Sequence, residues 1–514
     1  MPQFVAGAHF YNHEMFGGIR PGEGVRLLSK AYFGLAVSAF ASSFVYIGLR
    51  NGLLLMVCDE LAFTPLETQA VDRLAELPAA FSFFVGLIAD AIPVFGFRRK
   101  SYIIIGAVLT LGSLLLTSIA YCFDSSFRHV LGRGYVYLVA FLIGSVSVGS
   151  MISFASVQTM VVALSQREIL KERGIIQANY LIARGSGQVV ARILVFLVNR
   201  AGIAYQVSLM LLALTAISVM TIISTIVYLD EDQDFSRQTI RSKCDKHWVL
   251  SQQKAMWRTL SFISSFAFCL GFKFSEAQKA LQEWSHAGSK TSLLLSSILV
   301  DFVMIGTVIV WRSYYMNTLW RRVFSAAPAA SIISTVMVST FTIPAILRNQ
   351  VIYALLTGIT GVSAAFIALS TLVPVTEIAQ EGSEGGVAGL AISFYTISKV
   401  FANTFLSALQ NSNVIDLGDP VQDSSHVRWT VATAQIVTVL VNALSFAGIV
   451  LLPMQKLDAQ QLRTFGGFAR SAGSVTVIVF VLLLVYCIVY NCLVLIPSTA
   501  CVVIAGRSGC HPES

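Results

Sequence analysis

Two apolar stretches of the sequence carry polar and charged side chains at a spacing that places them on one face of an α-helix. In the first stretch, positions one or two helical turns apart form a single stripe, which consists of Gln177, Arg184, Gln188, Arg192 and Asn199. Charged side chains inside a membrane are costly and are retained where they face a bundle interior or a water-filled cavity. The stripe therefore indicates a polar cavity in which Arg184 could bind an anion. Arg192 is close enough to the end of its stretch to reach the membrane interface instead.

The second stretch repeats this arrangement around another cation. The polar residues that share its face are Thr396, Lys399, Asn403, Ser407 and Gln410. A ligand of opposite charge would offset the desolvation of a buried cation. The predicted substrate-binding residues are Arg184, Gln188, Lys399 and Asn403.

Carboxyl groups occur in two further apolar stretches, at Glu76 and Asp301. A carboxyl group removed from water takes up a proton more readily, so these two residues are the candidates for proton coupling. The alternative interpretation is that Glu76, Asp301 and Lys399 form structural ion pairs.

A short polar loop follows the stretch that contains Glu76. The apolar run ends on Asp90, a Pro/Gly turn follows, and three cations at 98–100 precede the next apolar run. Lys and Arg gather in cytoplasmic loops, and the carboxylate can pair across the turn or with the exposed N–H groups of a neighbouring helix. We predict that this loop braces the start of the helix near 384–386. The predicted conformational latch consists of Gly86, Asp90, Arg98, Arg99 and Glu384.

The composition indicates that the apolar stretches are membrane helices. Of 514 residues, 55% are hydrophobic and only 12% are charged, whereas soluble domains carry about 25% charged residues. A bilayer core about 30 Å thick requires about 20 apolar residues per helix. The predicted spans are residues 31–49, 74–91, 102–121, 135–161, 175–198, 205–229, 257–274, 291–311, 323–344, 351–373, 387–409, 430–452 and 474–500.

A charged stretch divides these spans into two groups of six, followed by one more. The predicted divisions are a cytoplasmic tail (1–30), a six-helix bundle (31–229), a cytoplasmic central loop (230–257), a second six-helix bundle (258–452) and a linker with an extra hydrophobic helix and tail (453–514). In transporters with this plan, the ligand site lies between the halves. The positive-inside rule places the loop at 98–100 and the N-terminus in the cytoplasm. The last hydrophobic helix either spans the membrane or re-enters it.

Other chemistries have no matching motif. The eight cysteines form no CxxC pair and no metal-ligand spacing, and no nucleophile or metal-ligand cluster lies within the predicted spans. The Lys and Arg residues of cytoplasmic loops account for much of the formal charge of +8 without a nucleic-acid partner. We therefore expect no catalytic residues, metal or cofactor, and we expect a small-molecule substrate and the lipid bilayer as partners.

The loop at Asp90 also resembles a known motif. Gly86, Asp90, Gly96, Arg98 and Arg99 fit the Gly-x-x-x-Asp and Gly-x-Arg-Arg layout between helices 2 and 3 of the major facilitator superfamily. Its longer form, Asp-x-x-Pro-x-x-Gly-aromatic-Arg-Arg-Lys-x-Tyr, resembles the folate–biopterin transporter family specifically. Similar stretches at 173–184, 376–388 and 499–510 extend the resemblance over nearly the whole chain.

This resemblance implies a fold and a function. The implied fold is an all-α, major facilitator-type membrane protein with two six-helix bundles, twelve transmembrane helices in total, and an additional C-terminal hydrophobic helix. The implied function is secondary active transport of a folate- or pterin-type anion by alternating access, with a proton as the coupling ion. We expect a multi-pass protein of the plasma membrane.

The sequence departs from the family pattern at three places, one of them 397–398, where an Asn is expected midway along helix 11. Ser82 and Phe83 stand where members often carry a Lys-Pro pair, and 154–162 contains no carboxylate where helix 4 often carries acidic residues. The cargo and the proton coupling therefore stay open. The alternatives are the same fold transporting a nucleoside or S-adenosylmethionine, and a transporter-like receptor or sensor without net flux.

Overall fold

The computed structural model of the protein describes residues 17–22, 24–61, 63–123, 134–200, 205–411 and 423–496. Within these ranges the chain is helical, and its only extended pairings are the isolated bridges Val94–Phe97 and Gln253–Phe468. The prediction of an all-helical protein is therefore confirmed. Residues 499–510, which resemble the closing motif of the family, and residues 497–500 of the predicted final span lie outside the described residues.

The chain up to residue 228 forms the first group of helices. These are α2 (Phe33–Ile47), η1 (Gly48–Leu54), α3 (Leu55–Glu60), α4 (Pro65–Glu76), η2 (Leu77–Phe81), α5 (Ser82–Ala91), α6 (Lys100–Cys122), α8 (Gly134–Ser165), α9 (Ile175–Arg200) and α10 (Gln206–Tyr228). We call this group the N-terminal half.

A helix within the predicted central loop, α11 (Ile240–Gln252), leads to the second group. That group, the C-terminal half, comprises α12 (Lys254–Gly271), α13 (Ser275–Trp284), α14 (Lys290–Val310), η4 (Trp311–Tyr315), α15 (Trp320–Phe324), α16 (Ala326–Thr342), α17 (Gln350–Gly358), α18 (Thr360–Ser370), α19 (Val373–Ile378), α20 (Glu384–Asn411) and α21 (Ser425–Ile449). Two more helices follow, α22 (Lys456–Phe465) and the hydrophobic α23 (Arg470–Leu495).

Twelve helical segments of the described chain are long and apolar enough to cross a membrane. The pair α12 and α13, bent by 42° at a short break, makes a thirteenth if it counts as one span. The bend lies at the predicted span 257–274, whose apolar run is followed by the charged residues of α13. The protein is therefore an integral, multi-pass membrane protein.

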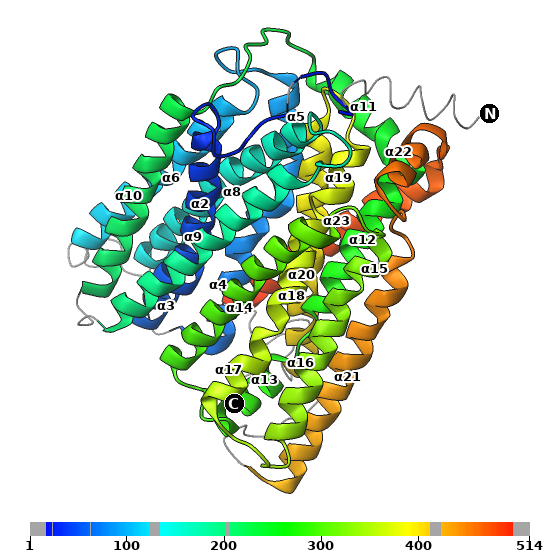
Figure 1. The fold of residues 1–514 in the computed structure, drawn as a ribbon. Coiled ribbons are helices and arrows are strands. Elements are labelled where there is room, and N and C mark those ends of the chain that lie inside the picture. The colour runs from blue at the N-terminus through cyan, green and yellow to red at the C-terminus, as the bar shows by residue number, and fades with distance from the viewer. Residues whose placement is uncertain are drawn as a thin grey trace, which may run out of the picture.

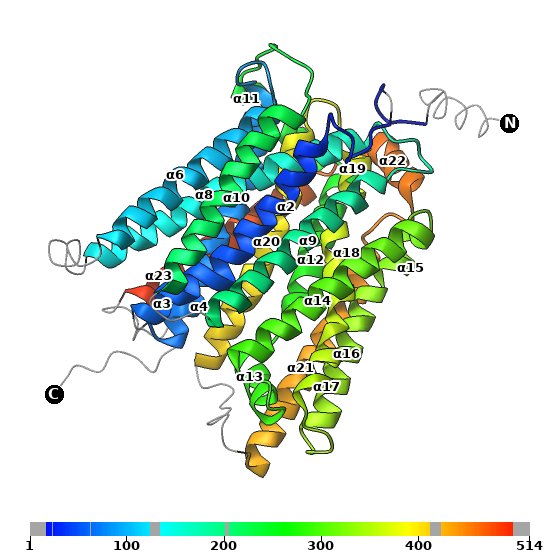
Figure 2. The ribbon, with the colours of Figure 1, turned by 60° about the vertical axis from the view of Figure 1, so that its left-hand side comes forward.

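The two halves stand side by side and share one interface. Helices α6, α8 and α10 lie on one side, and α16, α17 and α21 lie on the other (Figures 1 and 2). Between them, α9 packs against α14, and α5 packs against α20. Helix α23 packs against α4 and α20, so it covers the line where the halves meet.

Local sequence explains where the interface helices begin and break. Thr64 caps α4 through a reciprocal capping box with Glu67, and Pro65 occupies the first helical turn. Pro78 lies in the 3₁₀ segment η2 between α4 and α5, because proline removes a hydrogen-bond donor from a continuous helix. The break redirects the chain between Glu76 and the turn at Asp90.

Glycines allow α5 and α20 to approach backbone to backbone. A Cβ atom on Gly86 would lie 2.0 Å from the carbonyl oxygen of Gly385, and one on Gly385 would lie 2.5 Å from the carbonyl oxygen of Gly86. Any larger side chain would separate the helices here. The contact brings the end of α5 against the first turn of α20.

Candidate functional site

A cavity of about 580 Å³ lies between the two halves. The N-terminal half contributes residues of α2, η1, α4, α8 and α9, and the C-terminal half contributes residues of α14, α18 and α20. The predicted site residues in its wall are Glu76, Arg184, Gln188, Asp301 and Lys399. Asn403 is half-buried one turn further along α20 and does not line this cavity.

One cluster of charges joins the halves on the α4–α20 side of the cavity. The Nζ atom of Lys399 lies 2.6 Å from Oε1 of Glu76, and Nη1 of Arg50 lies 3.0 Å from Oε2 of the same carboxylate. Arg50 also forms an ion pair with Asp72. Tyr46 donates its hydroxyl to Glu76 over 3.0 Å. Two cations and two carboxylates therefore neutralise one another in this cluster.

A second ion pair joins the halves on the α9–α14 side. The Nε atom of Arg192 lies 2.6 Å from Oδ2 of Asp301, and the Asp301 side chain is almost fully buried. Both sides have the same kind of contact between the halves. A carboxylate on α4 pairs with a cation on α20, and a carboxylate on α14 pairs with a cation on α9. Each pair must separate if the halves move apart at this depth.

Arg184 is the cavity cation that these pairs leave over. The wall holds four cations and three carboxylates in all, so it has an excess of one positive charge. The guanidinium carbon of Arg184 lies 4.6 Å from the centre of the Phe154 ring, and Arg184 has no carboxylate partner among the described residues. A guanidinium held over an aromatic ring keeps its charge and its donors available. The cavity therefore presents a net positive charge on a polar and aromatic wall.

Two functional residues of this cavity were missed by the sequence interpretation. Arg50 directly follows the first predicted span, which ends at residue 49, so the sequence gives no reason to place it in the cavity. In the structure the first span continues through the π-helical segment η1 to Glu60, which places Arg50 and Tyr46 in the cavity wall. The number of consecutive apolar residues in the sequence does not indicate that this span continues through a π-helical segment.

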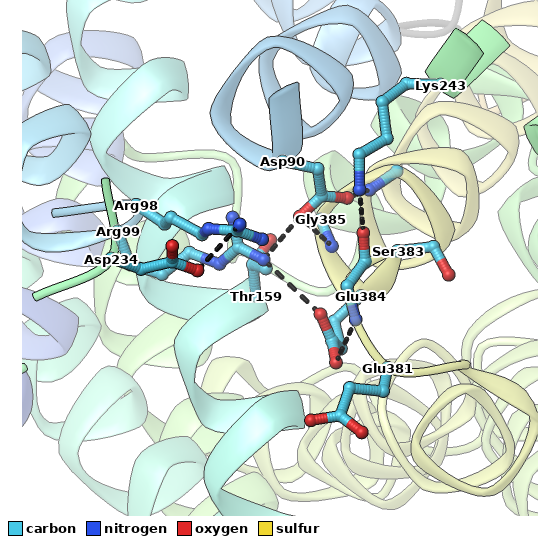
Figure 3. Close-up of polar contacts among 12 residues, drawn as sticks. Asp90, Arg98, Arg99, Thr159, Asp234, Lys243, Glu381, Ser383, Glu384 and Gly385 are labelled. Atoms are coloured by element: carbon cyan, nitrogen blue, oxygen red, sulfur yellow. Dashed lines mark hydrogen bonds and ion pairs between the residues drawn. The ribbon is translucent and has the colours of Figure 1, made fainter. Parts of the chain in front are cut away.

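At one end of the molecule, the start of α20 meets the turn after α5 (Figure 3). The buried carboxylate of Asp90 accepts hydrogen bonds from the backbone N–H groups of Gly385 (3.2 Å) and Gly386 (2.8 Å). These groups belong to the first turn of α20, where the helix dipole favours a negative charge. The Nη2 atom of Arg99 lies 2.5 Å from Oδ1 of the same carboxylate. We call this end the latch end.

The other predicted latch residues lie around this contact. Glu384 forms an ion pair with Arg20 and lies 3.6 Å from Arg99. Arg98 instead pairs with Asp234 over 2.7 Å (Figure 3). The pairs of Glu384 are therefore central to the latch end, whereas Arg98 tethers the loop that precedes α11.

Helix α11 adds two buried side chains to the same contact. Lys243 donates to the carbonyl oxygen of Gly382 (Figure 3). His247 packs against Gly386, and its Nε2 atom lies 3.9 Å from Oδ2 of Asp90. Burial lowers the pKa of His247 to about 4, so the imidazole is neutral near pH 7. Helix α11 therefore forms part of the closed latch end.

A second buried cluster closes the latch end between the loop after α8 and α19. The Nη1 atom of Arg173 lies 2.9 Å from Oε2 of Glu377, which also accepts a 2.6 Å hydrogen bond from Gln460. Lys456 donates to the carbonyl oxygen of Arg173 over 2.7 Å. Burial raises the pKa of Glu168 in this loop to about 7 and lowers the pKa of Lys456 to about 8. These groups hold the halves together over a wide area.

The opposite end carries a weaker link between the halves. Lys290, at the start of α14, lies 2.6 Å from Asp59 near the end of α3, and both side chains are exposed. An exposed ion pair is worth about 0–1 kcal/mol. The described part of the chain contains no group of three or more His, Cys, Asp or Glu side chains placed to hold a metal ion. The site is thus a charged cavity of about 580 Å³ between the halves, and the latch end of the molecule is closed by buried contacts.

Comparisons with known proteins agree with this architecture. The sequence profile of the BT1 family, the folate–biopterin transporters, matches residues 48–463. No curated protein matches the chain at a significant level. Among solved structures, the chain is similar to the proton:xylose symporter XylE of the major facilitator superfamily, bound to 6-bromo-6-deoxy-D-glucose, with 12% identity and a TM-score of 0.55 over 79% of this chain and 94% of that one. It is also similar to a bacterial homologue of the human drug peptide transporters PepT1 and PepT2, with 12% identity and a TM-score of 0.53 over 82% and 98%. The likeness to these structures concerns the fold, and it confirms the predicted major facilitator-type architecture.

Proposed function

This chain belongs to the BT1 family and is a membrane transporter with a small-molecule substrate, and on that premise we propose that it carries a folate- or pterin-type organic anion by alternating access. The cavity between the halves is the proposed substrate site. Arg184 and Lys399 would bind the carboxylates of the substrate, and Gln188 would donate or accept a hydrogen bond beside them. Asn403 would contact a substrate that reaches further along α20.

The excess positive charge of the cavity is the observation that carries this proposal. Arg184 has no carboxylate partner among the residues described, so an anionic group on the substrate would complete its pairing. A flat ring could lie against Phe154 or Tyr395, which are both in the wall. A cation such as S-adenosylmethionine would add to an existing positive charge, and an uncharged nucleoside would leave Arg184 unpaired.

The proposed movement is a rocking of residues 31–229 against residues 258–452. In the structure, the contacts of Asp90, Glu384 and Glu377 hold the latch end closed, whereas the far end has the exposed pair of Lys290 and Asp59. The proposed cycle breaks the latch end and closes the far end around the substrate. From the positive-inside rule we propose that the latch end and the N-terminus face the cytoplasm, and we propose the plasma membrane as the location.

Glu76 and Asp301 differ as proposed coupling acids. Protonation of Asp301 would leave one cation, Arg192, without its partner. Protonation of Glu76 would leave both Arg50 and Lys399 without this carboxylate. Asp301 is therefore the better candidate for a proton-binding step, and Glu76 is the better candidate for competition with a substrate carboxylate for Lys399.

Transport by purified protein in vesicles tests the proposal. Uptake and counterflow are measured with a labelled folate, a labelled pterin, a nucleoside and S-adenosylmethionine, with and without an inward proton gradient. We expect saturable exchange of the folate or pterin. Exchange of another solute alone would reject this cargo, and binding without counterflow would identify a receptor instead of a transporter.

A further inference from the structure

The C-terminal half carries a second large hollow that the transport site does not use. It has a volume of about 740 Å³, against about 580 Å³ for the central cavity. Its wall is formed by α14 and η4 on one side, by the segment from Thr318 to Ala326 on the other, and by Val362 and Phe366 of α18. Both α14 and α16 pack against α18, so α18 forms the floor between them. We call this hollow the α14–α16 groove.

Small side chains line part of the groove. Gly306 and Thr307 of α14 and Ala326 of α16 all belong to its wall. A Cβ atom added to Gly306 would have no atom within 4 Å, so the space beside this glycine is empty. Val303, Val310 and Val323 complete an apolar wall. Because α14 and α16 are membrane spans, an apolar groove between them is open to the acyl chains of the bilayer.

The chemistry of the wall changes toward the latch end. There the groove is lined by Trp311, Tyr315, Thr318 and Arg322. Trp and Tyr are characteristic of the level of the lipid headgroups. Arg322 is exposed and has no carboxylate partner among the residues that the structure describes. An apolar channel that ends at a free guanidinium matches one acyl chain followed by a phosphate group.

The neighbouring cations are already engaged, which distinguishes Arg322. Arg312 donates to Oδ1 of Asn179 over 2.6 Å, and Arg321 donates to the carbonyl oxygen of Leu452 over 2.8 Å. These two side chains hold η4 against α9 and α15 against the chain just after α21. Arg322 alone among the three is left to face the groove.

We propose that the α14–α16 groove binds one anionic phospholipid from the leaflet at the latch end, with an acyl chain along Val303–Val310 and the phosphate on Arg322. This site is separate from the central cavity and does not depend on the identity of the transported solute. The bound lipid would occupy the groove from the membrane interior to the headgroup level. A phosphatidylcholine would fill the same channel, but its choline cation would reduce the attraction to Arg322.

Native mass spectrometry and thermal unfolding of the full-length protein test this site. Delipidated protein in detergent is titrated with dioleoyl-phosphatidylglycerol, with dioleoyl-phosphatidylcholine, and with glycerophosphoglycerol, which has the headgroup without acyl chains. We expect one retained phosphatidylglycerol and a raised Tm, weaker retention of phosphatidylcholine, and no effect of the headgroup alone. Equal retention of both lipids by the wild type, or a full effect of glycerophosphoglycerol, would overturn the proposal.

Two variants separate the charge from the space. Arg322→Gln should weaken phosphatidylglycerol binding about fivefold, which corresponds to the loss of one cation at a membrane surface. Gly306→Leu should fill the groove and prevent retention of both lipids. The matched controls are Arg200→Gln, an exposed cation at the end of α9, and Gly112→Leu, an exposed glycine of α6 whose Cβ would also meet no atom within 4 Å. Unchanged lipid retention in Gly306→Leu would overturn the proposed lipid site. A wild-type dimer that forms through the groove and retains no lipid would also overturn it.

Discussion

Lys399 of α20 and Glu76 of α4 form a 2.6 Å ion pair that connects the two halves of the protein across the central cavity. The pair of Arg192 and Asp301 connects the same halves on the other side. Each half thus contributes one carboxylate and one cation to these two pairs. A substrate carboxylate that approaches Lys399 has to compete with Glu76, so substrate binding and separation of the halves are coupled through one ammonium group.

The first prediction concerns the unpaired cation of the cavity. Arg184→Gln should lower anion uptake about 10- to 100-fold, because a charge-assisted hydrogen bond contributes about 1.5–3 kcal/mol. Arg184→Lys should retain part of the uptake because it keeps the charge. The measurement is labelled-folate uptake in vesicles, with the amount of inserted protein determined in parallel. Normal uptake by correctly inserted Arg184→Gln would remove Arg184 from the substrate site.

The second prediction concerns the interaction of Glu76 with Lys399. Glu76→Gln and Lys399→Met should each lower the Tm, since each leaves a charge without its partner in the cavity wall. The double variant should be more stable than the sum of the single effects implies, with a coupling energy of about 0.5–3 kcal/mol. A double-mutant cycle in thermal unfolding measures this energy. Additive effects of the two substitutions would show that the ion pair contributes no coupling.

The fold followed from the sequence because membrane helices have a strong and local signal. Apolar runs of sufficient length mark nearly every span, and the charged stretch after residue 229 marks the division. The cavity stripe at Arg184 was also visible, since one helix determines which of its own residues share a face. Arg50 was not visible, because the π-helical extension of the first span depends on packing against other helices. The ion pair of Arg98 with Asp234 was not visible either, because it depends on how the loop before α11 packs against the rest of the protein.

The third prediction concerns the buried carboxylate of the latch. Asp90→Asn should slow transport turnover more than it raises KM, because Asp90 contacts the start of α20 and does not line the cavity. The matched control is Arg98→Gln, which removes a pair with the half-exposed Asp234 and should have a small effect. Initial rates of uptake over a range of substrate concentrations separate the two parameters. A raised KM with normal turnover in Asp90→Asn would contradict a latch role.

The fourth prediction concerns the close approach of α5 and α20. Gly86→Ala should destabilise the closed latch end by about 1–3 kcal/mol, because its Cβ would lie 2.0 Å from the carbonyl oxygen of Gly385. Gly144→Ala is the control, since a Cβ on Gly144 meets no atom within 4 Å. Hydrogen exchange of the backbone at the start of α20 measures the opening. Equal protection in Gly86→Ala and the wild type would show that the helices can separate without cost.

The fifth prediction concerns the pH dependence of the latch end. Burial raises the pKa of Glu168 from 4.5 to about 7, although Oε2 and Oε1 accept the backbone N–H groups of Gly174 and Ile176. The folded protein therefore holds this proton more tightly than the unfolded chain does. The stabilising contribution of the protonated group is complete below pH 4.5 and is lost as the pH rises toward 7.

Wild-type protein should accordingly lose stability from Glu168 between pH 4.5 and 7, and Glu168→Gln should remove this part of the slope. The nearby Lys456 stays charged over this range because its lowered pKa, about 8, still lies above it. Thermal unfolding of both proteins at closely spaced pH values measures the difference. Parallel Tm curves for the wild type and Glu168→Gln would show that Glu168 is already ionised at the latch end throughout this range.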